Sequence, residues 1–202
     1  MGLGLVGFDL DMTLIDSRPA MMAAFEAMSG DMPASIDLDA VESRLGVKLE
    51  DELAYWFPTD CIAEAAACYR RHYVRLAADK TPSLPGAREA LAAVRAAGER
   101  AVIITAKHPV SAGPSLRAAG LTADGLFTHV HGPEKAEVLR SIRAAAYVGD
   151  TPPDIAAAIS AGVRAIGVAT GSFTESQLRL AGADLVFSTL EAFPAWYQRQ
   201  SG

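Results

Sequence analysis

Apolar residues fall into two patterns that alternate along most of the chain. Short apolar runs predict buried strands, whereas apolar positions three or four residues apart predict helices. The predicted strands are Leu3–Leu10, Ala101–Ala106, Leu126–Val130, Ala144–Gly149, Ala165–Ala169 and Leu185–Ser188. The predicted helices in the same region are Gly86–Ala97, Val110–Ala119, Lys135–Arg143 and Asp154–Ala161, and glycines stand where helices should end, at Gly98, Gly120, Gly162 and Gly182.

The segment between the first strand and residue 82 has a different character. Residues 17–81 show helical periodicity and no convincing strand. Strands separated by helices require right-handed crossovers, which build an open parallel sheet with helices on both faces. We therefore predict an α/β fold, with a Rossmann-like core domain formed by residues 1–16 and 82–202 and an inserted α-helical cap domain formed by residues 17–81.

Residues able to do chemistry stand just after successive predicted strands. In open parallel sheets the ligand binds beyond the carboxyl ends of the strands, so we expect these side chains to meet in one site. They comprise four acids, two lysines and a threonine: Asp9, Asp11, Thr105, Lys107, Lys135, Asp150 and Asp154.

Carboxylates gathered in one place repel one another unless a cation lies among them. Hard oxygen ligands suit Mg²⁺, so the sequence predicts a magnesium cofactor. A metal ion, a lysine and a threonine hydroxyl can neutralise a phosphoryl group while one carboxylate attacks phosphorus. The alternative is structural, with Asp9 and Asp11 in a turn, Thr105 capping a strand, Asp154 capping a helix and no metal.

In this order, the motifs Asp9-x-Asp11-x-Thr13, Thr105, Lys135 and Gly149-Asp150-x-x-x-Asp154 resemble those of the haloacid dehalogenase superfamily. The resemblance covers essentially the whole chain. It is strongest to the phosphoglycolate phosphatase-like branch, because a helical insertion follows the first motif and Leu84-Pro85-Gly86 reopens the core. In that branch the insertion is a mobile helical cap of the C1 type.

The resemblance implies a role for each motif residue. Asp9 would attack phosphorus, and Asp11 would protonate the leaving oxygen and then activate water. Thr105, the neighbouring Ala106 and Lys135 would hold phosphate oxygens.

The resemblance also implies a ligand set for Mg²⁺, formed by Asp9, the main-chain carbonyl of Asp11, and Asp150. Asp154 would support the metal site through water or through Lys135. True dehalogenases resemble this chain in fold but lack the acid/base carboxylate and need no metal, so Asp11 disfavours dehalogenation.

Met12 departs from the branch, in which this position is usually glycine. If the turn needs a positive φ, methionine adds local strain, and we expect retained chemistry with a changed cap contact. Three other residues are predicted substrate or cap contacts: Arg44, Lys48 and Lys107. Solvated surface charge is the alternative for each, and Lys48 also invites comparison with phosphonatases, which use a cap lysine as a Schiff base.

Three further features carry weaker signals. His129 and His131 have a spacing able to bind zinc, but without a third ligand nearby in the sequence we interpret them as polar rim residues. Gly167–Ser172 lacks nucleotide-loop spacing and predicts a strand-to-loop turn near the site. Cys61 and Cys68 are seven residues apart in a helical pattern and cannot bridge each other, so we interpret them as core residues of a cytosolic protein.

Composition and charge narrow the partners. The 202 residues are 50% hydrophobic and fit one globular domain or one domain with an insertion. A net charge of -6 without a basic block argues against nucleic acid. The apolar start is too short for a signal peptide, and no later segment approaches a membrane span, so we expect a cytoplasmic protein, monomer or homodimer, whose partner is a small phosphorylated metabolite.

The sequence therefore predicts a Mg²⁺-dependent phosphatase that hydrolyses a small phosphate monoester, phosphoglycolate or a sugar phosphate, through a phosphoaspartate on Asp9. One alternative is a phosphomutase, which a cap histidine near Asp16 would favour, and none is present. The other is a catalytically silent phosphate-binding or partner-binding domain, in which Met12 distorts the turn. The intact motif residues argue against it.

Overall fold

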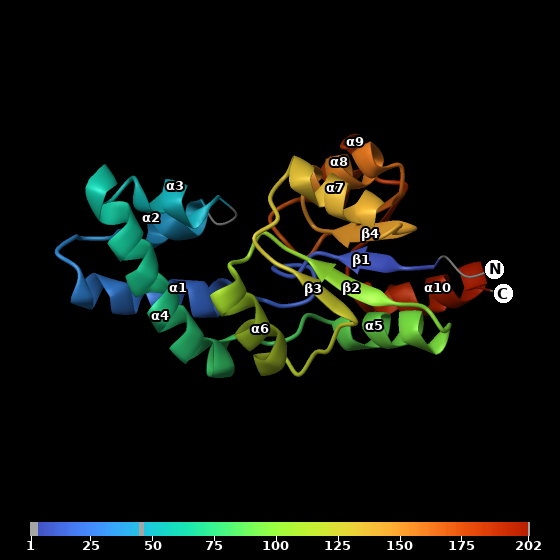
Figure 1. Cartoon of the computed structure of the whole chain (residues 1–202), viewed down its shortest axis with the longest axis horizontal. Coiled ribbons are helices and arrows are strands. Elements are labelled where there is room, and N and C mark those ends of the chain that lie inside the picture. Colours follow the sequence, from blue (N-terminus) through green and yellow to red (C-terminus); the bar gives the residue numbers. More distant parts are fainter. Residues whose placement is uncertain (1–3, 45–46, 202) are drawn as a thin grey trace.

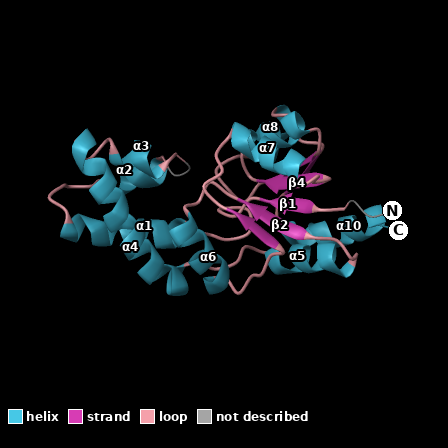
Figure 2. Ribbon diagram, in the orientation of Figure 1, coloured by secondary structure: helices cyan, strands magenta, loops and turns pink. Residues whose placement is uncertain are grey.

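A computed structural model, which describes residues 4–44 and 47–201, contains a parallel sheet of six strands (Figures 1 and 2). The strands are β1 (Val6–Phe8), β2 (Ala101–Ile104), β3 (Gly125–Phe127), β4 (Ala146–Gly149), β5 (Arg164–Val168) and β6 (Leu185–Phe187). They lie in the order β3-β2-β1-β4-β5-β6, and each neighbouring pair is parallel. The predicted α/β fold is confirmed.

Strand β1 lies inside the sheet and is buried along its whole length. Phe8 pairs with Ile103 of β2 on one side and with Val148 of β4 on the other. The chain builds β2 and β3 on one side of β1 and then β4, β5 and β6 on the other, so the strand order reverses beside β1. In open α/β sheets a ligand binds at such a switch point, beyond the carboxyl ends of the strands. Asp9 is the next residue of the chain.

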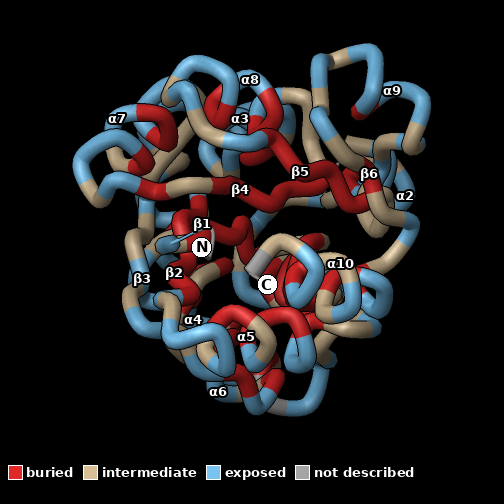
Figure 3. The backbone as a smooth tube through the Cα atoms, turned by 90° about the vertical axis from the view of Figure 1, so that its right-hand side faces the viewer, coloured by how far each residue is buried: buried red, intermediate tan, exposed pale blue. Residues whose placement is uncertain are grey.

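Helices cover both faces of the sheet (Figure 3). Helices α5, α6 and α10 lie on one face, and α7, α8 and α9 lie on the other. Successive strand residues alternate between the two faces, so Phe8 and Ile103 join one hydrophobic cluster while Val102 and Tyr147 join another. The helices are α5 (Ala87–Ala96), α6 (Pro109–Ala118), α7 (Pro133–Ser141), α8 (Pro152–Ala161), α9 (Glu175–Leu180) and α10 (Phe193–Ser201).

The segment between β1 and α5 forms a separate group of helices with its own hydrophobic cluster, which includes Phe25, Leu53 and Tyr69. Its elements are α1 (Arg18–Asp31), α2 (Leu38–Ser43), α3 (Leu49–Leu53), the 3₁₀ helix η1 (Thr59–Cys61) and α4 (Ile62–Lys80). Helix α4 packs against α1 on one side and against α6 on the other. Among the described residues, no helix is both long enough and apolar enough to span a membrane.

Two chain segments join the helical group to the sheet, and they run side by side. The Asp16 amide donates to the Pro82 carbonyl at 2.9 Å, and the Leu84 amide donates to the Leu14 carbonyl at 2.9 Å. Ile15 also forms an isolated antiparallel bridge with Ser83. The helical group therefore enters and leaves the sheet at one place, close to Asp11.

Several predicted boundaries differ from the structure. The first strand is shorter than Leu3–Leu10, because after Phe8 the chain leaves the sheet for a turn, and residues 1–3 lie outside the described residues. The strand predicted to reach Val130 ends at Phe127. Helices α9 and α10 were not predicted. The four glycines predicted to end helices all have positive φ, namely Gly98, Gly120, Gly162 and Gly182.

Candidate active site at the carboxyl ends of the strands

Asp9 leaves the sheet directly after β1. Its amide donates to the carbonyl of Val148 on β4 at 2.8 Å, which continues the ladder by one residue. Its carboxylate is buried and accepts a hydrogen bond from Lys135 Nζ at 2.7 Å. Breaking a buried hydrogen bond between charged groups costs free energy, so the bond from Lys135 holds the Asp9 side chain in one position.

Lys135, in the first turn of α7, lies between two acids. Its ammonium also donates to Asp154 Oδ1 at 2.7 Å. Asp154 closes a capping box with Thr151 at the start of α8, so one carboxylate both begins a helix and holds the lysine. The N-cap residue of α8 is Thr151, not Asp154 as the structural alternative expected, because Asp154 occupies the N3 position of the capping box.

Asp150 lies beyond β4 and is also buried. The hydroxyl of Thr13, the last residue of the first motif, donates to Asp150 Oδ1 at 3.1 Å. The neighbouring loop can approach because residue 171 is glycine: a Cβ atom there would lie 1.9 Å from Asp150 Oδ2. The Gly167–Ser172 turn thus lies beside the site, as the sequence predicted.

Met12 has a φ of 61°, the left-handed region that favours glycine. The positive φ on which the predicted strain depended is therefore present. Thr170, from the loop after β5, donates its hydroxyl to the Met12 carbonyl at 2.5 Å, and the Met12 amide donates to the Ile15 carbonyl at 2.8 Å. These bonds hold the turn in a conformation that methionine rarely adopts.

Asp11 lies at the edge of the site, and its carboxylate is partly exposed. Lys107 Nζ donates to Asp11 Oδ1 at 2.8 Å, and the Lys107 ammonium lies 4.3 Å from the ring centroid of Tyr73. Burial disfavours the charged form of Lys107, but the Asp11 carboxylate and Tyr73 together offset this penalty, so the pKa of Lys107 is raised. Through Tyr73, Lys107 contacts α4 of the helical group.

Thr105 and Ala106 follow β2. The Thr105 side chain is buried and its hydroxyl accepts from the Lys107 amide at 3.1 Å, which shapes the loop. Ala106 is exposed at the next position.

The electrostatics favour a cation among the acids. Burial, opposed by Lys135 and assisted by Asp154, raises the pKa of Asp9 to about 7. Burial and the charge of Asp9 raise the pKa of Asp150 well above its usual range. Carboxylate oxygens of Asp9, Asp150 and Asp154 lie within 4.8 Å of one another. Three buried acids with one lysine form a hard, electron-rich donor set, which fits Mg²⁺. The Asp11 carboxylate is not in this group.

Tyr147 is a site residue that the sequence reasoning missed. It is buried on β4, and its hydroxyl donates to the Ile104 carbonyl at 2.9 Å and lies 3.3 Å from Asp154 Oδ1. Lys135 lies 5.5 Å from its ring centroid. Tyr147 belongs to the apolar run that predicted this strand, and nothing in the sequence indicated that its hydroxyl would bond to a polar group.

The two predicted cap cations differ in their surroundings. Arg44 donates to both carboxylate oxygens of Glu52, at 2.8 and 2.7 Å, and its guanidinium lies over the Tyr55 ring. It is therefore engaged inside the helical group. Lys48 precedes α3, and burial of His131, assisted by the charge of Lys48, lowers the pKa of His131. Leu45 and Gly46, which stand between Arg44 and Lys48 in the sequence, lie outside the described residues.

Three histidines meet at the rim, one more than the sequence suggested. The ring centroids of His108 and His129 are 5.6 Å apart, and those of His129 and His131 are 4.9 Å apart. Their nitrogens do not converge within 4.8 Å among the described residues, so the polar rim interpretation fits better than a zinc site.

A second group of metal-type ligands lies in the helical group, where Asp31, Cys68 and His72 come within 4.8 Å of one another. Arg75 lies 2.8 Å from Nδ1 of His72, and Nε2 lies 2.7 Å from Asp31 Oδ2. Because arginine can only donate, Nδ1 accepts and Nε2 donates to Asp31. The group is thus a satisfied hydrogen-bonded chain between α4 and the end of α1. Both cysteines are free, as predicted.

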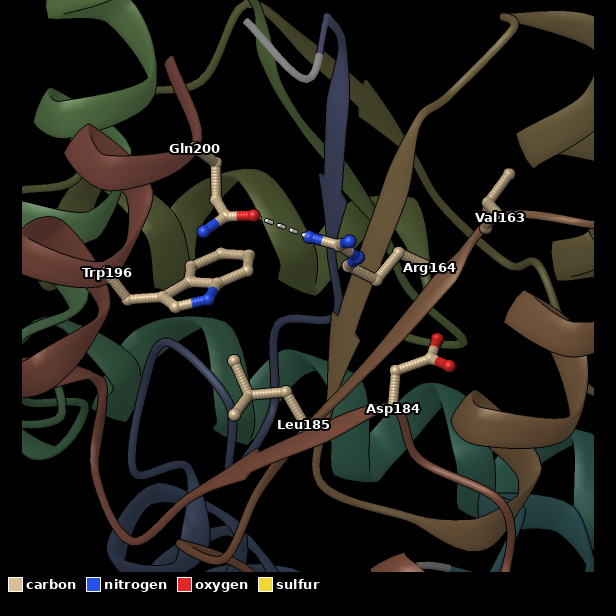
Figure 4. A pocket seen from close by; sticks show the side chains of 6 residues that line it. All are labelled: Val163, Arg164, Asp184, Leu185, Trp196 and Gln200. Carbon is tan, nitrogen blue, oxygen red and sulfur yellow. Dashed lines mark hydrogen bonds between the residues drawn. The ribbon is translucent and has the colours of Figure 1, made fainter. Parts of the chain in front are cut away.

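A broad hollow of about 510 Å³ lies at the opposite end of the sheet (Figure 4). It is bounded by the starts of β5 and β6 and by α10, and Arg164 there donates to Gln200 at 3.1 Å. It contains none of the predicted site residues. The chemistry is concentrated at the carboxyl ends of the strands.

The chain is similar in sequence and in fold to known hydrolases. The family model for haloacid dehalogenase-like hydrolases matches residues 6–168. The chain is 31% identical to the probable phosphatase IndB of Dickeya dadantii, covering 92% of this chain and 89% of that protein. It is 30% identical to the plasmid phosphoglycolate phosphatase of Cupriavidus necator, covering 93% and 90%. The crystal structure of a predicted phosphoglycolate phosphatase from Haemophilus somnus has a TM-score of 0.81 at 20% identity, covering 97% of this chain and 99% of that one.

Proposed function

The chain belongs to the haloacid dehalogenase-like hydrolases and is a phosphatase of that family, and on this premise we propose that it hydrolyses a small phosphate monoester through a phosphoaspartate on Asp9. One observation carries the proposal: Asp9 is buried at the end of β1, fixed by Lys135 and grouped with Asp150 and Asp154. Grouping three buried carboxyl groups costs free energy through charge repulsion, and a purely structural role for Asp9 would not require it.

Mg²⁺ would be held by Asp9, Asp150 and the main-chain carbonyl of Asp11, with Asp154 supporting the site through Lys135. When bound, the ion neutralises charge on the phosphoryl group and on the neighbouring carboxylates. Lys135 would remain near Asp9 and pair with a phosphate oxygen, and Thr105 with the Ala106 amide would hold others. The presence of a single lysine beside three buried acids supports a site for a further cation.

The reaction divides into two displacements. In the first, a carboxylate oxygen of Asp9 attacks phosphorus, the bond from phosphorus to the alcohol oxygen breaks, and Asp11 gives that oxygen a proton. In the second, Asp11 takes a proton from water as the water oxygen attacks phosphorus, and the bond to Asp9 breaks. The sum is ester plus water giving alcohol plus inorganic phosphate, with both carboxyl groups restored.

We further propose that residues 17–81 act as a cap domain over a core formed by residues 1–16 and 82–202. The separate hydrophobic cluster of the helical group and the paired connections near Asp11 and Pro82 support this division. A lid of this kind excludes water and selects the leaving group. Cytoplasmic location and a monomeric or dimeric state stay predictions.

Phosphoglycolate is the lead substrate, because relatives that match over most of the chain carry the name phosphoglycolate phosphatase. A sugar phosphate is the second candidate. Measuring kcat/KM over a panel of phosphorylated metabolites with Mg²⁺ distinguishes the two. The true substrate should have the highest kcat/KM, because contacts between the protein and its leaving group stabilise the transition state.

The reaction class is tested with an aryl phosphate and Mg²⁺. Asp9→Asn should reduce kcat by ~10³-fold or more, because the amide cannot form the covalent intermediate. Asp60→Asn, on an exposed aspartate of the helical group, should leave kcat unchanged. Absence of turnover by the wild type with every phosphate ester would favour a catalytically silent binding domain.

A further inference from the structure

Lys107 is the only donor to the Asp11 carboxylate among the described residues. Its ammonium is 2.8 Å from Oδ1, and its side chain is 9% exposed whereas that of Asp11 is 29% exposed. Lys107 therefore holds one oxygen of Asp11, while the second oxygen accepts no hydrogen bond from the described residues.

The main chain of Lys107 is also fixed. Its amide donates to the Thr105 hydroxyl at 3.1 Å, and its carbonyl accepts from the His129 amide at 2.9 Å. The loops after β2 and β3 thus hold the base of the side chain. A lysine without these anchors would lose more side-chain entropy when it pairs with a carboxylate.

The tip of the side chain is held by the helical group. The Tyr73 ring of α4 packs on the ammonium with 4.3 Å to its centroid, and Tyr73 is fully buried. The Tyr73 hydroxyl lies 3.1 Å from the Ser115 hydroxyl of α6, and Ser115 in turn donates to the Ser111 carbonyl at 2.9 Å. Lys107 therefore stands between the acid/base residue and a helix of the proposed cap.

We propose that Lys107 is a positioning residue, which fixes the rotamer of Asp11 so that its second oxygen meets the leaving group, and that Tyr73 holds Lys107 in place. This inference rests on the proposed function of Asp11. As the bond from phosphorus to the alcohol oxygen breaks, the proton moves from Asp11 to that oxygen. A displacement of about 1 Å in the donor is enough to lose much of this assistance.

Leaving groups of different basicity test the proposal. The ratio kcat/KM reports the steps through departure of the alcohol, which is assisted by a proton only when the alcohol is a poor leaving group. Lys107→Met keeps the apolar stem and removes the ammonium. It should lower kcat/KM by about 10²-fold for an alkyl phosphate and by less than about threefold for 2,4-dinitrophenyl phosphate. Equal losses for both substrates would overturn the proposal and indicate a phosphate-binding or purely structural lysine.

A double-mutant cycle with Asp11→Asn supplies an independent result. If Lys107 acts through Asp11, then Lys107→Met should add less than about twofold to the loss in the Asp11→Asn background with the alkyl phosphate. Independent, multiplicative losses would contradict it. Tyr73→Leu should steepen the leaving-group dependence in the same sense, whereas Tyr73→Phe, which keeps the ring over the ammonium, should not.

The controls separate this inference from the proposed function. Lys80→Met, on an exposed lysine of α4, should keep the wild-type leaving-group dependence. If the wild type and Asp11→Asn have the same leaving-group dependence of kcat/KM, the proposed acid/base role of Asp11 is wrong. If Asp11→Asn has a steeper dependence and Lys107→Met does not, only the proposal for Lys107 is wrong. If Lys107→Met does not fold, Lys107→Arg replaces it. We then expect a smaller increase in the leaving-group dependence of kcat/KM, and equal losses for both substrates would again contradict the proposal.

Discussion

At the scale of single residues, Met12 is one of three described non-glycine residues with a positive φ, beside His129 and Arg143, and it is the one next to Asp11. Its φ of 61° is held by bonds from Thr170 and to Ile15. A side chain in this region costs roughly 1–3 kcal/mol, and more when it is β-branched. Glycine would remove the cost but would add about 0.5–1 kcal/mol of backbone entropy to the unfolded chain.

We therefore expect Met12→Gly to change the free energy of unfolding by no more than about 1 kcal/mol, and Met12→Val to reduce it by about 1 kcal/mol or more. Urea unfolding at equilibrium measures both. A Met12→Val protein as stable as the wild type would mean that the turn does not keep a positive φ in solution. If strain also sets the Asp11 position, kcat should fall in the valine variant beyond any loss of folded protein.

Some contacts of single residues could be predicted from the sequence and others could not. The grouping of Asp9, Lys135 and Asp150 follows from their places after successive strands, because parallel strands bring their carboxyl ends to one edge. The bond between Asp11 and Lys107 does not follow, since it depends on rotamers and on the packing of Tyr73 from another element. No regular spacing in the sequence connects Asp11, Lys107 and Tyr73, so the sequence did not predict these two contacts.

At the scale of elements, the loop after β5 closes the site against Asp150. We expect Gly171→Ala to move this loop or the carboxylate, because the new Cβ would lie 1.9 Å from Asp150 Oδ2. Activity should fall at least ~10-fold, and the Mg²⁺ concentration for half-maximal activity should rise, as happens when a ligand or its support is displaced. Steady-state assays over a range of Mg²⁺ measure both quantities.

Gly30→Ala is the matched control for that substitution. Gly30 lies in α1, and an added Cβ would meet nothing within 4 Å. Alanine should stabilise the helix by up to about 1 kcal/mol and leave the Mg²⁺ dependence as it is. Equal behaviour of the two alanine variants would show that close approach at Gly171 has no part in forming the site.

Elements differ in how strongly their own sequence marks them. Buried strands such as β2 and β4 were predicted because they are continuous apolar runs bounded by polar residues. Helix α9 has six residues and depends on a capping box of Thr174 with Gln177, and α10 places Trp196 and Tyr197 against Phe193. Short helices of this kind are stabilised by packing more than by periodicity, so the pattern alone did not predict them.

At the scale of the whole molecule, two groups of buried residues meet at one edge of the sheet. The helical group has its own hydrophobic cluster, and its two connections to the sheet are bonded to each other near Asp16 and Pro82. The contact between α4 and α6 lies beside Lys107. A change in the angle between the helical group and the sheet would therefore displace Lys107 and, through its hydrogen bond, the Asp11 side chain.

Buried carboxyl groups should link the stability of the whole molecule to the proposed binding of Mg²⁺. Asp9, Asp150 and Asp154 are all buried and close together, with Lys135 between two of them. Mg²⁺ bound only by the folded chain should stabilise it by about 2.7 kcal/mol at a concentration of 100 Kd. For a chain of this size, that raises Tm by roughly 5–10 °C relative to protein in EDTA. Calorimetry with and without Mg²⁺ measures the shift, and Asp150→Asn should remove most of it while Asp60→Asn keeps it. A Tm independent of Mg²⁺ in the wild type would contradict the metal site, because three buried acids that gain a divalent cation cannot do so without lowering the free energy of the folded state.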